Sequence, residues 1–380
     1  MAPRRKRPSP AQIAMRRLGL LVVVLALAGA GLALASGPSG PDRGRPSKHA
    51  LRAREAASRA RAAAAKVVNL APGSDPAVLP GPVLIADRDN NRLIEVSPTG
   101  HVLWQFPRPG ELPPGQTFKI PDDVFFTPDG HHVIVTEEDD FVVRIIDIQT
   151  GQVTYQYGHP GVSGSSADYL FNPDDALLHH NGQIIMGDIK NCRVLTITPP
   201  SHQITRQFGQ TGDCIHQAGV TYGSPNGAFP MSNGDTVVTE INGSWVDVLT
   251  PSGNVVSSAN IPNFTYPSDT NEVRPGVFLS ADYTDPGAVE TFTPQGKLLW
   301  SYAPTGAKAL NQPSLALPLP NGDVITNDDY NDRVIVIDPH TNKIVWQYGH
   351  TGHPGTRPGY LHKPDGIDLA PPYNLMSRFR

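Results

Sequence analysis

The sequence contains little of what marks several common protein classes. It has only two cysteines in 380 residues, which excludes a disulfide-rich scaffold and a zinc site built from several cysteines. Aromatic residues make up 7% of the chain, whereas 39 prolines and 36 glycines interrupt it throughout. So many helix breakers exclude a helical bundle and favour short strands joined by turns.

No short motif names a reaction. The sequence has no HExxH helix, no close cysteine and histidine spacing for zinc, and no GxSxG nucleophile elbow. The segment 223–227 (GSPNG) places Pro225 directly after the serine, and no strand-to-helix turn is expected there. Any chemistry must therefore be argued from where the fold places individual side chains.

Positive charge is scarce beyond the N-terminal region. Residues 1–66 carry 14 of the 31 basic residues and two acids, so residues 67–380 hold 17 basic and 33 acidic residues, a net charge of −16. An anionic domain repels phosphate backbones, which argues against a nucleic-acid partner and favours cations or cationic ligands.

A long uncharged run, residues 18–35, follows a basic segment, residues 1–17. Its length and basic flank favour a retained signal anchor. The alternative is a signal peptide cleaved near Ala35, which would release a secreted protein. Residues 36–66 form a basic linker or stalk. We expect a single-pass protein of the cell membrane, with residues 1–17 in the cytoplasm and the remaining domain outside it.

One pattern recurs six times between residues 83 and 345: a short apolar strand that ends in an acid, a polar loop, a second strand, a tight turn and a third strand. The acids recur every 42 to 52 residues and are Asp87, Glu137, Asp188, Glu240, Asp282 and Asp328. Strand-only repeats of this period are the signature of a β-propeller, an all-β fold. Each blade is expected to have four strands, a to d. The Asn-Gly and Asp-Gly pairs between strands a and b predict type I′ turns.

The two ends of the repeat region complement each other. The first repeat lacks strand a, and residues 363–369 form a strand a with no strand b after it. We therefore expect a six-bladed propeller over residues 67–372, closed by this C-terminal strand, with residues 373–380 as a tail.

Two repeat families share these steps. Residues 87–93 (DRDNNRL) resemble the repeated step of NHL repeats, as do residues 188–194 and 328–334. Residues 146–153 and 337–346 resemble the step of PQQ-like repeats. The resemblance implies a propeller and leaves function open, because both repeat types serve many roles. Quinoprotein dehydrogenases of this kind have eight blades, adjacent cysteines and a calcium site. Six blades without a Cys-Cys pair argue against bound PQQ.

The b–c loops and d–a connections of a propeller share one face, here called the top face. The six b-strand acids are expected there, and further acids begin the a strands: Asp122, Asp123, Asp174, Asp175, Asp269 and Asp365. They could form an anionic ring for Ca²⁺ or a cationic ligand. Alternatively, each acid caps its loop or pairs with an arginine, which makes Glu240 and Asp282, without such partners, the better candidates.

Histidines gather in the d–a connections, which contain His159, His216, His350 and His353. One interpretation is a Zn²⁺ site or a general base beside an aspartate, and the other is surface histidines without catalysis. Trp245, close to Glu240, either lines a pocket or packs in the core. Cys192 and Cys214 predict a disulfide in an exported chain, worth about 3 kcal/mol by loop entropy, or two free thiols in a cytoplasmic one.

These features favour a membrane-tethered, extracytoplasmic propeller that binds a protein or small-molecule ligand through its acidic top face. The alternative is a metal-dependent lyase or hydrolase of the NHL-like kind. A quinone-dependent oxidoreductase is a weaker alternative.

Overall fold

The computed structural model describes residues 66–379. The predicted membrane segment at residues 18–35 lies outside this range, as does all of the predicted linker except Lys66. Within the described range, no helix has the length and apolar character needed to cross a membrane.

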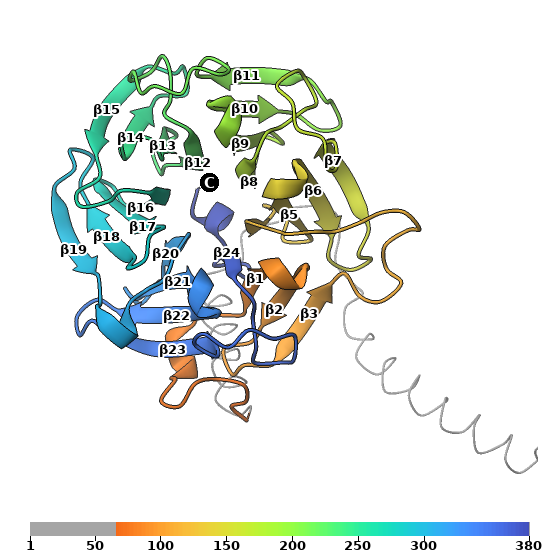
Figure 1. Ribbon diagram of the computed structural model, residues 1–380, viewed down its shortest axis with the longest axis vertical. Coiled ribbons are helices and arrows are strands. Elements are labelled where there is room, and N and C mark those ends of the chain that lie inside the picture. The colour runs from red at the N-terminus through yellow and green to blue at the C-terminus, as the bar shows by residue number, and fades with distance from the viewer. Residues whose placement is uncertain (1–65, 380) are drawn as a thin grey trace, which may run out of the picture. The chain divides into compact units, whose positions relative to one another are not determined.

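Six antiparallel four-stranded sheets form the blades of a propeller (Figure 1). Each blade has its strand a nearest the axis and its strand d outermost. In this order, the strands are β24 (Pro364–Leu369), β1 (Val83–Asp87), β2 (Arg92–Val96) and β3 (Val102–Phe106) in blade 1; β4 (Val124–Phe126), β5 (His132–Glu137), β6 (Val142–Asp147) and β7 (Val153–Gly158) in blade 2; and β8 (Pro173–Leu178), β9 (Ile184–Asp188), β10 (Arg193–Ile197) and β11 (Ile204–Phe208) in blade 3.

The second half repeats the arrangement. Its strands are β12 (Pro225–Pro230), β13 (Thr236–Glu240), β14 (Trp245–Leu249) and β15 (Val255–Asn260) in blade 4; β16 (Pro267–Arg274), β17 (Val277–Asp282), β18 (Ala288–Phe292) and β19 (Leu298–Tyr302) in blade 5; and β20 (Ala316–Pro318), β21 (Val324–Asp328), β22 (Arg333–Asp338) and β23 (Lys343–Gly349) in blade 6.

Helical structure in the described chain is limited to short 3₁₀ turns. These are η1 (Pro76–Val78), η2 (Arg88–Asn90), η3 (Glu138–Asp140), η4 (Ile189–Asn191), η5 (Gly306–Lys308), η6 (Asp329–Asn331) and η7 (Leu375–Arg378). Four of them, η2, η3, η4 and η6, follow directly after strand b of their blades and form the b–c loops of the top face.

The predicted closure of the ring is confirmed. Strand β24 pairs antiparallel with β1, and the register joins Val83 to Leu369 and Ile85 to Ile367. The last described strand therefore completes the first blade, so that the sheet edge that β1 would otherwise expose is covered.

The core lies between the blades. One apolar cluster extends through all six of them, from Val83 and Phe125 to Trp346 and Ile367. Its edge-to-face pair of Phe125 and Phe229, with ring centroids 6.0 Å apart, joins strands β4 and β12 of blades 2 and 4. This packing fixes the a strands around the axis and so determines which side chains face it.

The predicted type I′ turns are wrong. In the a–b turn of blade 2, the Gly130 N–H donates to the carbonyl of Thr127, and Gly130 is the turn residue with positive φ, at 69°. A type I′ turn needs positive φ at both central positions, here Pro128 and Asp129. The glycine instead follows a turn whose central residues keep negative φ, as in longer hairpin loops.

Chain segments outside the blades also pack on the propeller. Leu70 forms a β-bridge with Tyr348, so the segment before blade 1 lies along the outer strand of blade 6. Leu375 and Met376 of η7 are buried in the core, and the Leu375 N–H donates to Asp368. The described part of the predicted tail, residues 373–379, therefore packs against the propeller on the face opposite the top face.

Candidate functional site

The acids at the ends of the b strands are buried and hold the fold together. Asp188 accepts hydrogen bonds from Arg193 Nε at 2.8 Å, from Asn191 Nδ2 at 2.8 Å and from the backbone N–H of Phe171 at 2.8 Å. It thereby joins strands b and c to the chain that enters strand a. Asp87–Arg92 and Asp328–Arg333 are equivalent pairs, and Glu137 pairs with Arg144, which lies two positions further along strand c. The architectural interpretation applies to these four acids.

The two acids without an arginine behave differently from each other. Asp282 accepts the backbone N–H groups of Thr265 and Tyr266 and the hydroxyl of Thr284, so its oxygens have donors. Glu240 instead contacts His216, whose Nδ1 lies 2.9 Å from Glu240 Oε1. Burial raises the pKa of Glu240 to about 7.

The other predicted histidines do not join such a group. His159 Nε2 lies 3.1 Å from Asp168 and its ring contacts Tyr169, whereas the ring of His350 lies against Tyr360. Like His350, His353 is exposed. In residues 66–379, His216 is the histidine that belongs to a cluster of three side chains spaced to hold a metal ion.

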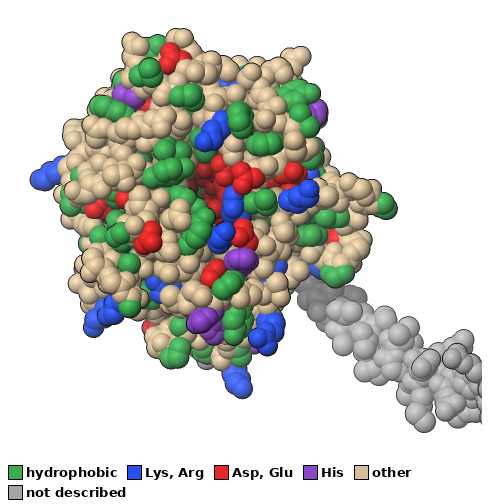
Figure 2. All heavy atoms as spheres, viewed as in Figure 1, with side chains coloured by type: hydrophobic (Ala, Val, Ile, Leu, Met, Phe, Trp, Pro, Cys, Tyr) green, Lys and Arg blue, Asp and Glu red, His purple; other side chains and the backbone are tan. Residues whose placement is uncertain are grey.

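A second set of acids surrounds the propeller axis at the top face, where Figure 2 shows red side chains gathered in a central hollow. We call it the central carboxylate cluster; its members are Asp122, Asp123, Glu138, Asp174, Asp175, Asp269, Asp329 and Asp365. Most of these acids stand at or beside the beginnings of the a strands. Because the a strands converge on the axis, the repeat brings these carboxylates together.

Arg88, from η2 of blade 1, is the cation that reaches this cluster. Its Nε lies 2.9 Å from Asp122 and 3.5 Å from Asp365, and its Nη2 lies 3.7 Å from Glu138. It offsets the charge of only part of the cluster. Asp123, Asp175 and Asp269 are at most 3% exposed, have no basic partner among the described residues, and form one of the groups spaced to hold a metal ion.

These three acids keep oxygens that no donor reaches. Both oxygens of Asp175, one of Asp123 and one of Asp269 are buried without a hydrogen-bond partner in the described structure. The carboxyl groups of Asp175 and Asp269 approach each other closely enough to hydrogen-bond, which requires a proton or a cation between them. Burial, reinforced by neighbouring carboxylates, raises the pKa of Asp175 well above its usual range and that of Asp269 to about 6.

A small pocket of about 60 Å³ opens above the cluster. Tyr266 and Tyr283 line it together with Asp122, Asp174 and Arg88, and Tyr266 is 38% exposed. A carboxylate floor with aromatic walls suits a cation, through charge and through cation–π contact.

A quinone does not fit this site. Pockets for organic ligands of that size occupy roughly 300–1,000 Å³, several times the volume found here. The two cysteines are also bonded to each other: Cys192 and Cys214 form the predicted disulfide, with their Cα atoms 5.1 Å apart. The adjacent cysteines of quinoprotein dehydrogenases have no counterpart in the sequence.

A larger surface pocket, of about 490 Å³, lies on the opposite face between blades 3 and 4. His179, Met231 and Met376 are among its lining residues. Burial lowers the pKa of His179 to about 4, so this histidine is neutral at physiological pH. Its other ionisable lining residues are His180, Arg206 and Asp235.

The sequence over residues 47–260, more than half of the chain, matches the family described as outer membrane protein assembly factor BamB. The chain belongs to this family of PQQ-like repeat proteins. Among curated proteins, none matches the chain in sequence.

Solved structures similar to this chain are propeller proteins of diverse kinds. A nidogen/laminin complex matches with a TM-score of 0.54 and 15% identity, over 76% of this chain and 98% of that one. A protein of unknown function from Bacteroides caccae matches with a TM-score of 0.51 and 13% identity, over 76% and 97%. A streptogramin B lyase matches with a TM-score of 0.50 and 14% identity, over 76% and 87%. At such identities the likeness shows the fold alone.

Sequence reasoning missed several residues of these sites. Arg88 and Glu138 begin η2 and η3, and nothing in the repeat indicated that these loops turn toward the axis. Asp247 joins His216 and Glu240 in one cluster. Its signal was present: it is an acid within strand c, at a position that is apolar in blades 1, 3 and 6.

Proposed function

We propose that this protein is a membrane-tethered, extracytoplasmic binding module that holds a hard divalent cation at its axis and engages a cationic ligand or partner at the top face. The observation that carries the proposal is the set of buried, donorless oxygens of Asp123, Asp175 and Asp269. Unpaired buried carboxylates are costly, and a cation bound among them removes that cost.

The chemistry of the donors favours Ca²⁺. The oxygens come from carboxylates, with the Asn226 side chain nearby: its Nδ2 lies 3.3 Å from Asp269 Oδ1, so its amide contacts the cluster. Hard oxygen donors suit Ca²⁺, which accepts six to eight such ligands in flexible geometry. Waters would supply the remaining ligands.

Two observations support a location outside the cytoplasm. The Cys192–Cys214 disulfide is typical of oxidising compartments. The basic segment and uncharged run of residues 1–35 provide the expected anchor. Extracellular calcium modules need only modest affinity, with dissociation constants of about 10⁻⁴–10⁻³ M.

Calorimetric titration of the full-length protein, freed of metal with EDTA, tests the proposal. We expect one Ca²⁺ per chain, with a dissociation constant of about 10⁻³ M or lower. Asp175→Asn keeps the shape of the side chain and removes its charge, and we expect it to weaken binding at least about tenfold.

The exposed Asp213→Asn variant is the matched control and should bind like the wild type. If the folded wild-type protein binds neither Ca²⁺ nor Mg²⁺, the proposal fails. Equal Ca²⁺ binding by Asp175→Asn would also overturn it.

A further inference from the structure

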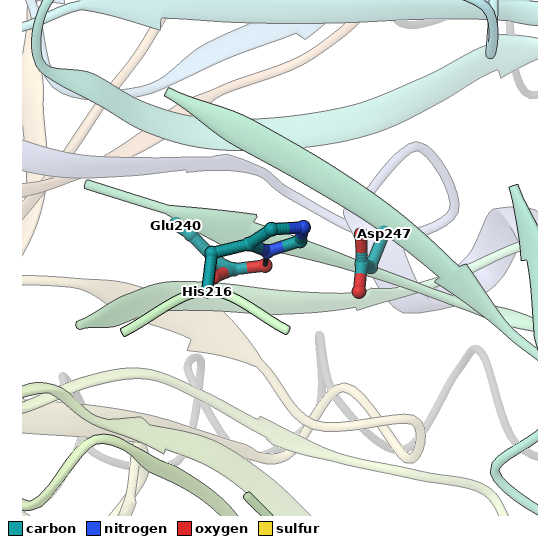
Figure 3. A group of neighbouring side chains, drawn as sticks. All are labelled: His216, Glu240 and Asp247. Carbon is teal, nitrogen blue, oxygen red and sulfur yellow. Dashed lines mark hydrogen bonds and ion pairs between the residues drawn. The ribbon is translucent and has the colours of Figure 1, made fainter. Parts of the chain in front are cut away.

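Blade 4 contains a polar cluster away from the axis, formed by His216, Glu240 and Asp247 (Figure 3). Glu240 ends strand β13, Asp247 lies within strand β14, and His216 comes from the connection between blades 3 and 4. One ligand atom from each residue lies within 4.8 Å of the others. Glu240 and Asp247 are fully buried, and the His216 side chain is 13% exposed.

The strand register shows that blade 4 has other residues where most blades have an arginine. Glu240 lies opposite Trp245, as Asp188 lies opposite Arg193. The position that holds the arginine in blades 1, 3 and 6 therefore holds a tryptophan here.

The second difference concerns Asp247. In blade 2, Glu137 is paired with Arg144, which lies opposite Val135. Asp247 lies opposite Val238, two residues before Glu240, and so stands in the position of Arg144. Blade 4 thus has a second acid where blade 2 has the neutralising guanidinium.

Both oxygens of Glu240 have a partner, His216 Nδ1 and the backbone N–H of Gly223, whereas Asp247 keeps one oxygen that no donor reaches. Asp247 Oδ1 is buried without a hydrogen-bond partner, and the neighbouring Tyr222 hydroxyl is also buried and unpartnered in the described structure. Asp247 also accepts from the backbone N–H of Gly219, at 3.4 Å from Oδ2, and from the Ser258 hydroxyl. Two buried carboxylates facing a single imidazole form a site that a divalent cation would neutralise.

The histidine ring is held in place for such a role. It stacks on Trp245 with ring centroids 4.0 Å apart and planes 5° apart. Cys214, two residues before His216, is bonded to Cys192 at the start of blade 3's strand c, which ties the loop to the propeller. The tryptophan that replaces the arginine therefore fixes the imidazole face, and the disulfide fixes its backbone.

We propose that His216, Glu240 and Asp247 form a binding site for a transition-metal ion of the Zn²⁺ class, separate from the central carboxylate cluster. An imidazole with two carboxylates suits Zn²⁺ better than Ca²⁺, which prefers oxygen ligands alone. His216 Nδ1 and Glu240 Oε1 are 2.9 Å apart, and ligand atoms around a tetrahedral Zn²⁺ are about 3.3 Å apart, so a small movement admits the ion. The Asp247 carboxylate completes the set of protein ligands, and water or the Tyr222 hydroxyl fills the fourth position.

Titration with Zn²⁺ and with Co²⁺, on the EDTA-treated full-length protein in excess Ca²⁺, tests the site. We expect one Zn²⁺ per chain that displaces Co²⁺, and visible absorption bands typical of tetrahedral Co²⁺. His216→Gln and Asp247→Asn should each weaken Zn²⁺ binding by about 10- to 100-fold or more. Circular dichroism and retained Ca²⁺ binding verify that each variant is folded.

Glu290→Gln is the matched control, because Glu290 occupies in blade 5 the same register position that Asp247 occupies in blade 4. It should bind Zn²⁺ like the wild type, as should Asp175→Asn. If the folded wild-type protein binds no Zn²⁺, the cluster is a hydrogen-bonded network only and the proposal is wrong. Undiminished binding by both His216→Gln and Asp247→Asn would place the metal elsewhere and would equally overturn it.

Discussion

The propeller buries two sets of carboxylates, and the two sets are satisfied in different ways. Asp188, which represents the b-strand ends, has an arginine, an asparagine and a backbone N–H as donors. Asp175, at the beginning of strand β8, has none. Burial is equal in the two, since both side chains are fully inaccessible. A buried acid therefore indicates a ligand site only where the fold supplies no donor for it.

The largest expected effect comes from breaking a satisfied acid. Asp188→Ala leaves Arg193 as a buried charge without its partner and removes the acceptor of the Phe171 N–H. We expect a loss of about 3–5 kcal/mol in the free energy of unfolding, measured by urea denaturation. Exposed Asp213→Ala should change it by less than about 0.5 kcal/mol. If Asp188→Ala loses less than about 1 kcal/mol, the interpretation that this pair stabilises the fold is wrong.

The acids of the central carboxylate cluster should make stability depend on pH, beside the paired acids, whose pKa values burial also raises. The pKa values of the cluster acids are raised in the folded protein, to about 6 for Asp269. At a pH between the usual aspartate pKa and the raised value, the native state therefore binds more protons than the unfolded state. Without divalent cations, their contribution to stability is present at low pH and lost as the pH rises through the raised pKa values.

Each proton involved contributes a slope of at most about 1.4 kcal/mol per pH unit. Urea denaturation in EDTA at about pH 5 and about pH 8 should show a shallower decline for Asp175→Asn than for the wild type. The difference between the two proteins separates the cluster from other buried acids. Identical slopes, or a wild-type stability that rises with pH, would contradict the expectation.

The smallest expected effect comes from a substitution that crowds the central carboxylate cluster. Gly227, in strand β12, faces it so closely that an added Cβ would lie 2.3 Å from Asp175 Oδ2. Gly227→Ala should displace this carboxylate and weaken Ca²⁺ binding about tenfold, or by about 1.4 kcal/mol, in the calorimetric titration. Gly81→Ala, whose Cβ meets nothing nearer than 3.8 Å, is the control. Unchanged affinity in Gly227→Ala would mean that Asp175 does not bind the ion.

The fold was largely predictable because the information is local and repeated. The acid and arginine at the two ends of a b–c loop, such as Asp188 and Arg193, lie five residues apart and meet across a single turn. The candidate sites were less predictable from the sequence. Asp247 is recognised as a possible ligand only once the strand register aligns it with Arg144. It also depends on the loop that brings His216 close to it from another part of the chain. The aspartates of the a strands were visible, but their lack of donors depends on side-chain directions that no spacing encodes.

The closure of blade 1 has a consequence for how the chain folds. The inner neighbour of strand β1 is β24, and Val83 pairs with Leu369. All the other blades lie between these two strands in the sequence. Such non-local pairing slows folding, because the entropy of ordering a long loop must be lost before the contact forms. Until β24 arrives, β1 presents an open strand edge that can pair with another chain. We therefore expect aggregation to be favoured as long as β24 has not docked on β1.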